Sequence, residues 1–437
     1  MRGAIAAVLW AILAAPGRAE NWPQWRGPFF NGSTTETNLP QSWGENENVA
    51  WVTPLSGPSG STPIVWGGRI FLSSLDVRTK GLLAVCIDAQ TGRILWQKPT
   101  GRERAFSRNN MASPSPVTDG KGVYFLYGTG ELAAFNYEGR PLWSKDLEKE
   151  HGKFAVLFGY SSSPLLYAGK LYVLVMHRDV PIREEEADPR DPKKSYLLAI
   201  DPQTGKDLWK HVRPTDAKIE SHESYSTPMP YDFGGQSQII IFGADYLTGH
   251  DSRTGRELWR WATYNPDQVN HWRTVSSPVV TRDMIYVSGP KKEPLFAIRT
   301  GGEGNVGADY VAWKFVEFTT DAATSLYYKG RLYVLDGDKR VMTCLDGRTG
   351  RRIWQGDMGG SEVFRGSPTG ADNKIYCMNE RGEVVVLAAD EYKVLFRISM
   401  GGPVARSTIV AANGRLLIRT AKALHCIRFT KPIQADR

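Results

Sequence analysis

The chain has 437 residues, of which 41% are hydrophobic and 23% are charged, and it contains 44 glycines, 26 prolines and 14 tryptophans. This composition excludes a disordered chain, because apolar residues are plentiful, and it excludes a coiled coil, which is rich in Ala, Glu, Lys and Leu instead. The formal net charge is +8, but the basic residues are spread along the sequence, so we expect no nucleic-acid partner.

The first twenty residues have the pattern of a secretory signal peptide. Arg2 supplies a positive start, residues 4–15 form a short apolar run, and Gly17 and Ala19 are small residues before an expected cleavage site. The run is too short to span a membrane, and no longer apolar run follows it. We therefore expect a signal peptide over residues 1–19, no transmembrane segment, and a mature protein that works in the periplasm or outside the cell. The alternative is a buried N-terminal helix.

The rest of the chain repeats a motif, Asp-x-x-Thr-Gly, in which a tryptophan follows the aspartate by eight residues. The full copies begin at Asp88, Asp201, Asp251 and Asp346. An aspartate can accept hydrogen bonds from the backbone two or three residues further on, and glycine adopts a positive φ, so the motif predicts a tight turn before a strand. The tryptophans of the full and altered copies, with one more near the start, are Trp51, Trp96, Trp143, Trp209, Trp259, Trp313 and Trp354.

The period of the motif predicts the fold. Trp143 and Trp209 are 66 residues apart, whereas Trp313 and Trp354 are 41 residues apart. Units of this size are typical of propellers with four short strands in each blade. The full units span about residues 60–100, 112–147, 161–212, 224–263, 275–316, 322–358 and 366–400.

The last unit contains only three strands. Its fourth strand is predicted at the other end of the chain, where residues 48–53 contain a tryptophan but no further strands. Pairing this strand into the last blade closes the ring and removes an exposed edge. We therefore predict an all-β fold, an eight-bladed β-propeller of four-stranded antiparallel blades over residues 46–429. A leader segment, residues 20–45, precedes it, and a C-terminal tail, residues 430–437, follows it.

The repeat resembles the β-propeller repeat of pyrroloquinoline quinone (PQQ)-like proteins, and the resemblance covers nearly all of the chain after residue 46. That superfamily includes the quinoprotein alcohol dehydrogenases and a periplasmic propeller lipoprotein of the outer-membrane β-barrel assembly machinery. The leader, Trp-Pro-Gln-Trp-Arg-Gly-Pro over residues 22–28, resembles the start of many secreted, uncharacterised members. The repeat identifies the fold, but it does not indicate which function a member has.

For the enzymes of that superfamily, the resemblance implies PQQ with Ca²⁺ as the cofactor. Those enzymes are longer and stack the quinone on a ring formed by two adjacent cysteines, whereas the four cysteines here are separate in the sequence. Neither a calcium-ligand set nor a catalytic aspartate can be placed by motif, so no cofactor, metal or catalytic residue is assigned. Cys86, Cys344 and Cys426 share one repeat position and are predicted to be buried free thiols, because equivalent positions in different blades lie too far apart for a disulfide.

The ligand site is expected where loops precede the first strand of each blade, around the mouth of the central channel. These loops contain arginines, which suit carboxylates or phosphates, and an aromatic side chain, which suits a flat ring or a sugar. The alternative is that the charged groups form ion pairs that tie the blades together. The candidate residues are Arg108, Asn109, Asn110, His222, Glu223, His271, Trp272, Arg273, Glu362, Arg365 and Arg406.

Three functions remain open. The first is a binding or scaffolding propeller for a small anionic ligand, a peptide, a glycan or a protein partner. The second is a PQQ-dependent quinoprotein oxidoreductase of the alcohol dehydrogenase type. The third is a hydrolase or lyase of polysaccharides that uses His222, Glu223 and His271, which also match a metal-ligand set. An inserted segment, residues 178–194, is rich in charge and proline and is predicted to be a solvated loop or, alternatively, a lid or partner-docking arm.

Overall fold

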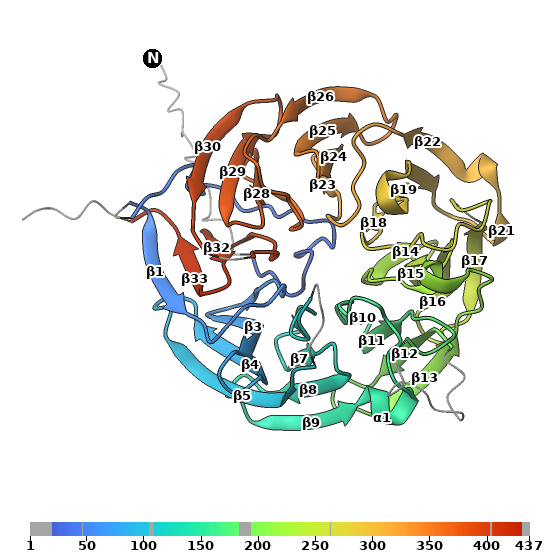
Figure 1. Ribbon diagram of the computed structural model, residues 1–437, viewed down its shortest axis with the longest axis horizontal. Helices are drawn as coiled ribbons and strands as arrows, with labels where there is room; N and C mark the ends of the chain where they lie inside the picture. Colours follow the sequence, from blue (N-terminus) through green and yellow to red (C-terminus); the bar gives the residue numbers. More distant parts are fainter. Residues whose placement is uncertain are drawn as a thin grey trace, which may run out of the picture.

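The computed structural model describes residues 20–45, 47–104, 109–182, 194–262, 264–402 and 404–430. Eight sheets are arranged side by side around a common centre, so the predicted eight-bladed propeller is confirmed (Figure 1). The predicted signal peptide, Arg108 and residues 183–193 of the inserted segment lie outside the described residues. Within the described part of the chain, no helix is long and apolar enough to cross a membrane.

The strands of each blade follow one another from the centre of the ring to its rim. In blades one to four these are β2 (Ile64–Trp66), β3 (Arg69–Asp76), β4 (Gly81–Asp88) and β5 (Ile94–Arg102); β6 (Val117–Thr118), β7 (Val123–Leu126), β8 (Glu131–Phe135) and β9 (Pro141–Asp146), followed by α1 (Leu147–His151); β10 (Leu165–Tyr167), β11 (Lys170–Val175), β12 (Tyr196–Ile200) and β13 (Asp207–Val212), followed by η2 (Ile219–His222); and β14 (Met229–Phe233), β15 (Gln236–Gly243), β16 (Tyr246–Asp251) and β17 (Glu257–Ala262).

The second half of the ring repeats this order. Blades five to eight contain β18 (Val279–Val280), β19 (Met284–Ser288), η3 (Pro290–Lys292), β20 (Leu295–Arg299) and β22 (Val311–Phe315); β23 (Leu326–Tyr328), β24 (Arg331–Asp336), β25 (Val341–Asp346) and β26 (Arg352–Asp357); β27 (Thr369–Ala371), β28 (Lys374–Met378), β29 (Glu383–Ala388) and β30 (Val394–Ser399); and β31 (Val410–Ala412), β32 (Arg415–Arg419) and β33 (Ala423–Ile427), with β1 (Val49–Pro54). Between β20 and β22 the chain also forms β21 (Gly304–Val306), which joins the sheet of blade four, and η4 (Ala308–Tyr310).

The position of a strand within its blade decides how it is buried. The second and third strands are covered on both faces by the neighbouring blades, and residues such as those of β11 and β12 are almost all buried. The fourth strands lie at the rim, and β9 and β13 alternate between exposed and partly buried residues. This difference explains why the inner strands are continuous apolar runs, whereas the rim strands alternate with polar residues.

The repeated turn and the repeated tryptophan form a single contact between neighbouring blades. In the turn after β12, the Asp201 Oδ1 accepts hydrogen bonds from the backbone N–H groups of Gln203 (2.8 Å) and Thr204 (2.9 Å). Gly205 has a φ of +72°, and a Cβ there would lie 2.6 Å from the ring of Trp143 in the preceding blade. The Trp143 Nε1 donates to the carbonyl oxygen of Pro202 at 2.9 Å. The motif therefore joins blade two to blade three, and Trp313 of blade five makes the same contact with Gly350 of blade six.

Blade four departs from the predicted four strands because β21 pairs in parallel with β17 and makes the sheet five-stranded. In blade five, the turn before the fourth strand is longer and contains β21 and η4. This longer turn lies along the rim of blade four, instead of packing its glycine against Trp259 as a normal turn would. Trp259 is opposite Gly304 in the register, and its Nε1 donates to Gln238 of its own blade at 2.9 Å. The extra strand replaces the contact that a normal turn makes elsewhere.

A ring of buried hydroxyl groups connects the inner ends of the blades. Among the described residues, seven of the eight hydroxyls, all except that of Thr408, accept a hydrogen bond from the backbone N–H of the equivalent residue in the preceding blade. These seven hydrogen bonds are 2.8 to 3.2 Å long. The residues of this hydroxyl ring are Thr62, Ser115, Ser163, Thr227, Ser277, Thr324, Ser367 and Thr408.

The chain ends close the ring as predicted. β1 pairs antiparallel with β33, and Trp51 lies opposite Cys426. Figure 1 shows β1, in blue, beside the red strands of the last blade. The hydroxyl ring closes at the same place, because the N–H of Thr408 donates to the Oγ1 of Thr62 at 3.2 Å.

The leader is an integral part of the propeller, which the sequence did not indicate. It follows the turns between the first and second strands, on the face opposite the channel mouth. Trp22 is fully buried and forms two backbone hydrogen bonds with Val65 of blade one, at 2.9 and 2.8 Å. Further along, the N–H of Thr34 donates to the carbonyl of Gly370 in blade seven at 3.1 Å. The leader thus crosses the base of the channel from one side of the ring to the other.

Candidate functional site

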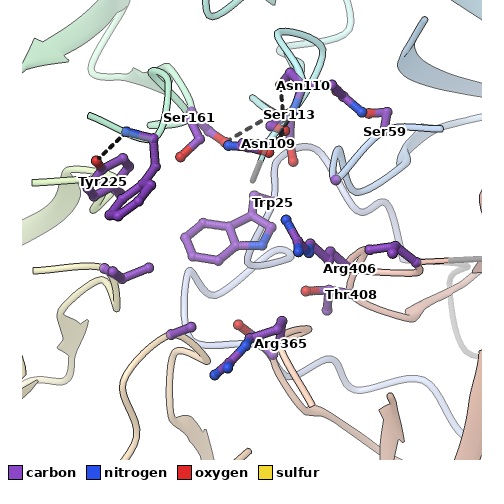
Figure 2. A pocket seen from close by; sticks show the side chains of 18 of the residues that line it. Trp25, Ser59, Asn109, Asn110, Ser113, Ser161, Tyr225, Arg365, Arg406 and Thr408 are labelled. Atoms are coloured by element: carbon purple, nitrogen blue, oxygen red, sulfur yellow. Dashed lines mark hydrogen bonds between the residues drawn. The ribbon is translucent and has the colours of Figure 1, made fainter. Parts of the chain in front are cut away.

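A cavity of about 840 Å³ opens at the centre of the mouth face, within the size range of small-molecule sites. We call it the mouth pocket. Loops from different blades supply its wall, and the leader supplies Trp25, whose indole lies in the middle of the pocket in Figure 2. Trp25 reaches the pocket from the base of the channel and forms its floor, so the pocket has the shape of a cup. The wall includes Ser59, Asn109, Asn110, Ser113, Ser161, Tyr225, Arg365, Arg406 and Thr408 (Figure 2).

Five of the residues selected from the sequence line the mouth pocket: Asn109, Asn110, Arg273, Arg365 and Arg406. They come from four different blades, and only the closed ring brings them together. The Nδ2 of Asn110 donates to the carbonyl of Pro58 at 3.1 Å, so this side chain also connects blades one and two. Their role in ligand binding stays a prediction.

Five other selected residues do not line the pocket: His222, Glu223, His271, Trp272 and Glu362. His271 is exposed, and Trp272 packs against the core of blades four and five. The Nε2 of His222 lies 4.0 Å from an oxygen of Asp179, and Glu362 lies 3.6 Å from Arg381.

Glu223 is held in a buried network beneath the pocket wall. One oxygen accepts from the Tyr225 hydroxyl at 2.7 Å and from the Leu157 N–H at 3.0 Å. The other pairs with the Nε of Arg178, at the base of the inserted segment. Burial and the neighbouring carboxylate raise the pKa of Tyr225 well above its usual value, so this hydroxyl stays protonated and donates. The network positions Tyr225 in the wall.

The proposed trio of metal ligands, His222, Glu223 and His271, does not assemble. Among the described residues, one group of three metal-capable side chains has its ligand atoms within 4.8 Å of one another, and it consists of Glu150, His151 and Asp207. That group lies at the rim, where the ammonium of Lys145 already contacts Glu150 at 2.9 Å and Asp207 at 2.6 Å.

Each arginine of the mouth pocket pairs with an acid on a neighbouring loop. The Nη1 of Arg273 lies 3.3 Å from Glu220, and its Nη2 lies 3.6 Å from Asp321. The guanidinium of Arg365 approaches Asp338 to 2.6 Å. The Nε of Arg406 lies 2.7 Å from Glu380. These contacts cross from blade to blade, so the ion pairs that we considered as the alternative are present.

The charged groups of the wall balance one another. Three arginines, Arg273, Arg365 and Arg406, face three acids, Glu103, Asp321 and Glu380. Burial raises the pKa of the Glu103 carboxyl above its usual value. The pocket is therefore not a cationic cup of the kind that the arginines alone suggested.

Aromatic side chains cover the remaining part of the wall and the base. Phe158 and Tyr225 lie on one side, where the guanidinium carbon of Arg273 is 5.1 Å from the centre of the Phe158 ring. Trp25 is partly buried and follows the fully buried Trp22 by three residues. An aromatic ring held in a pocket of paired charges provides a flat apolar surface with polar groups around it.

Sequence reasoning missed Trp25, although a signal was present. The leader contains Trp22 and Trp25 within the segment 22–28, and neither tryptophan belongs to the repeat. The adjacent Arg26 is fully buried and donates to the carbonyls of Ser325 at 2.9 Å and Asn31 at 3.0 Å. Burial lowers the pKa of its guanidinium to about 9. This anchored arginine fixes the backbone that presents Trp25.

The fold and the pocket define the chain as an eight-bladed β-propeller with a pocket at the mouth of its channel. The family model described as "Outer membrane protein assembly factor BamB" matches residues 34–179, 157–339 and 337–431. The chain therefore belongs to this family of propellers. No curated protein matches the sequence significantly.

Solved structures support the fold at low sequence identity. BamB from Moraxella catarrhalis is 14% identical, with a TM-score of 0.54 over 87% of this chain and 100% of that one. The quinohemoprotein alcohol dehydrogenase from Comamonas testosteroni is 12% identical, with a TM-score of 0.67 over 95% of this chain and 82% of that one. A europium-containing methanol dehydrogenase is 9% identical, with a TM-score of 0.67 over 92% and 90%. These likenesses show the fold alone.

The mouth pocket does not fit PQQ with Ca²⁺ in the way that the resemblance to the enzymes implies. The four cysteines are free and buried, as predicted for three of them, and none lines the pocket. Two of the three wall carboxylates, Asp321 and Glu380, already pair with arginines. A flat tricarboxylate would meet these acids, and a calcium ion would compete with the arginines for them. We derive no chemical step through this cofactor.

Proposed function

We propose that the protein is a binding or scaffolding propeller whose ligand site is the mouth pocket. The observation that carries this proposal is the pocket itself: a cup of about 840 Å³ at the centre of a rigid ring, with an aromatic base and paired charges. Membership of a family named for an assembly factor supports a role in binding rather than in catalysis.

The composition of the wall is a second support. Among the described residues that line the pocket, there is no histidine, lysine or cysteine. The possible bases or nucleophiles of the wall are therefore the carboxylates Glu103, Asp321 and Glu380, and the last two already pair with arginines. His222, Glu223 and His271, which we considered as the residues of a polysaccharide hydrolase or lyase, do not line the pocket.

A ligand screen with a matched pair of double variants tests the proposal. Arg365→Gln with Asp338→Asn removes an ion pair at the pocket, which is 2.6 Å long. Arg352→Gln with Glu317→Gln removes an exposed pair of the same length outside the pocket. Small molecules, peptides, oligosaccharides, and PQQ with Ca²⁺ would be screened by thermal shift and native mass spectrometry.

We expect at least one compound to bind the wild type and the Arg352 and Glu317 variant equally, and to bind the Arg365 and Asp338 variant at least about tenfold more weakly. The proposal fails if no compound binds, or if every compound that binds has the same affinity for the Arg365 and Asp338 variant as for the wild type. Reduction of a redox dye by the PQQ-loaded sample would favour the oxidoreductase instead.

We also propose that the protein works in the periplasm or outside the cell. The proposal rests on the sequence of residues 1–19. Expression in a bacterial host, followed by fractionation and N-terminal sequencing, should recover a chain that begins at Glu20. A full-length chain in the cytoplasmic fraction would contradict it.

A further inference from the structure

We infer that the mouth pocket binds a neutral carbohydrate, a short oligosaccharide in which one sugar ring stacks on Trp25. This inference deepens the proposed binding function of the same pocket and rests on it. Three features of the pocket carry it: the presentation of Trp25, the balance of charge, and the mixture of hydrogen-bonding groups.

Trp25 is presented as a platform. Trp22 on one side is fully buried and paired with blade one, and Arg26 on the other side is fully buried and donates to backbone carbonyls. The guanidinium carbon of Arg26 is 5.6 Å from the Trp25 ring. Between these anchors, Trp25 remains partly exposed in the middle of the pocket (Figure 2). A fixed indole loses little entropy on binding, and its face suits the C–H face of a sugar ring.

The charge balance argues against an ionic ligand. An anion would be attracted by Arg273, Arg365 and Arg406, but it would also lie near Asp321 and Glu380. A cation would be attracted by Asp321 and Glu380, but it would also lie near the three arginines. Because each arginine is already paired, a charged ligand would have to break an ion pair or leave one charge uncompensated. A neutral ligand keeps every pair intact.

The wall offers donors and acceptors side by side. The paired guanidinium and carboxylate groups each retain N–H donors or oxygen lone pairs, and the wall adds short neutral side chains. A sugar hydroxyl both donates and accepts, so it can bridge such neighbours. The neutral polar residues of the wall that lie outside the hydroxyl ring are Ser59, Asn109, Asn110, Ser113 and Ser161.

Isothermal titration calorimetry on the mature chain tests the inference with named probes. The neutral probes are tetrasaccharides of glucose, mannose, xylose and N-acetylglucosamine. The charged probes are tetragalacturonate and an acidic tetrapeptide. We expect at least one neutral probe to bind more tightly than either charged probe. Trp25→Ala should weaken that probe at least about tenfold, and Trp25→Phe, which keeps a stacking face, should stay within about threefold.

Two further variants keep the test decisive. Ser161→Trp fills the pocket without changing the leader and should abolish binding, even if Trp25→Ala unfolds the chain. Asp338→Asn releases Arg365 from its 2.6 Å ion pair and leaves an excess positive charge, so it should raise the affinity for tetragalacturonate relative to that for the neutral probe.

The outcomes separate this inference from the proposed function. Tighter binding of a charged probe, lost in Ser161→Trp, would overturn the carbohydrate but keep the binding pocket. Binding of a neutral probe that is unaffected by both Trp25→Ala and Ser161→Trp would overturn the site. If no neutral probe binds, the inference is wrong, and the broader screen with the Arg365 and Asp338 variant decides whether the pocket binds anything else.

Discussion

Trp354 and Trp25 are the same residue type in opposite surroundings. Trp354 belongs to the repeated position, is 9% exposed, and donates to the carbonyl of Ala389 in the next blade at 3.2 Å. Trp25 occurs once, comes from the leader, and remains partly exposed in the mouth pocket. The tryptophan that recurs in seven of the eight blades, with Phe396 in its place in blade seven, serves the ring, whereas one that lies outside the repeat at the centre indicates a site. Four predictions test this division.

Deleting residues 48–53 should have the largest effect. These residues supply β1, and without them β33 becomes an exposed edge while the ring loses its closing sheet. We expect aggregation or loss of the cooperative transition, measured by size-exclusion chromatography and thermal unfolding. A monomeric truncated chain with an unchanged melting temperature would show that ring closure does not depend on β1.

Trp354→Ala should lower the free energy of unfolding by about 3–5 kcal/mol, because it leaves a cavity between two blades. Trp25→Ala should cost about 1 kcal/mol or less, because its side chain is partly exposed and the neighbouring Trp22 and Arg26 hold the leader in place. Chemical denaturation of both variants measures the difference. Equal losses would contradict the division between ring and site tryptophans.

His250 should make the ring sensitive to acid. Its side chain is fully buried in blade four, and burial lowers its pKa from 6.5 to about 3. The unfolded chain therefore binds a proton between these pH values that the folded chain does not, and the stability falls as the pH falls through this window. The slope attributable to His250 is at most about 1.4 kcal/mol per pH unit.

Chemical denaturation between about pH 7 and about pH 4 should show a shallower fall in the free energy of unfolding for His250→Gln than for the wild type. His271→Gln changes an exposed histidine of the mouth face and serves as the control substitution. Identical slopes for all three proteins would mean that His250 is protonated in the folded state.

The smallest effect on stability is expected at the mouth. Arg365→Gln removes a partly exposed ion pair with Asp338, and such pairs contribute about 0–1 kcal/mol. The free energy of unfolding of this variant should stay within about 1 kcal/mol of the wild type. The substitution should change the free energy of ligand binding by more than it changes the free energy of unfolding. A loss comparable to that of Trp354→Ala would place Arg365 in the structure of the ring instead of the site.

The repeat was sufficient to predict the eight blades and the closing strand. Local signals such as the Asp201 to Gly205 turn and its partner Trp143 recur with each blade, so errors at one copy are corrected by the others. The five-stranded sheet of blade four was not predicted, because β21 arises where the turn of blade five breaks the pattern. Because this expanded turn occurs in one copy only, no other copy in the sequence indicates which structure it forms.

The amino-acid sequence by itself determined the ring, because each blade needs the same turn, tryptophan and buried strands to pack against its neighbours. It also led us to expect eleven loop residues at one mouth, of which Asn109, Asn110, Arg273, Arg365 and Arg406 line the pocket. Only the tertiary structure decided that the arginines are paired with acids and that Trp25 forms the base of the pocket. Those contacts join residues far apart in the chain, such as Arg26 and Ser325, and they depend on the path of the leader across the closed ring.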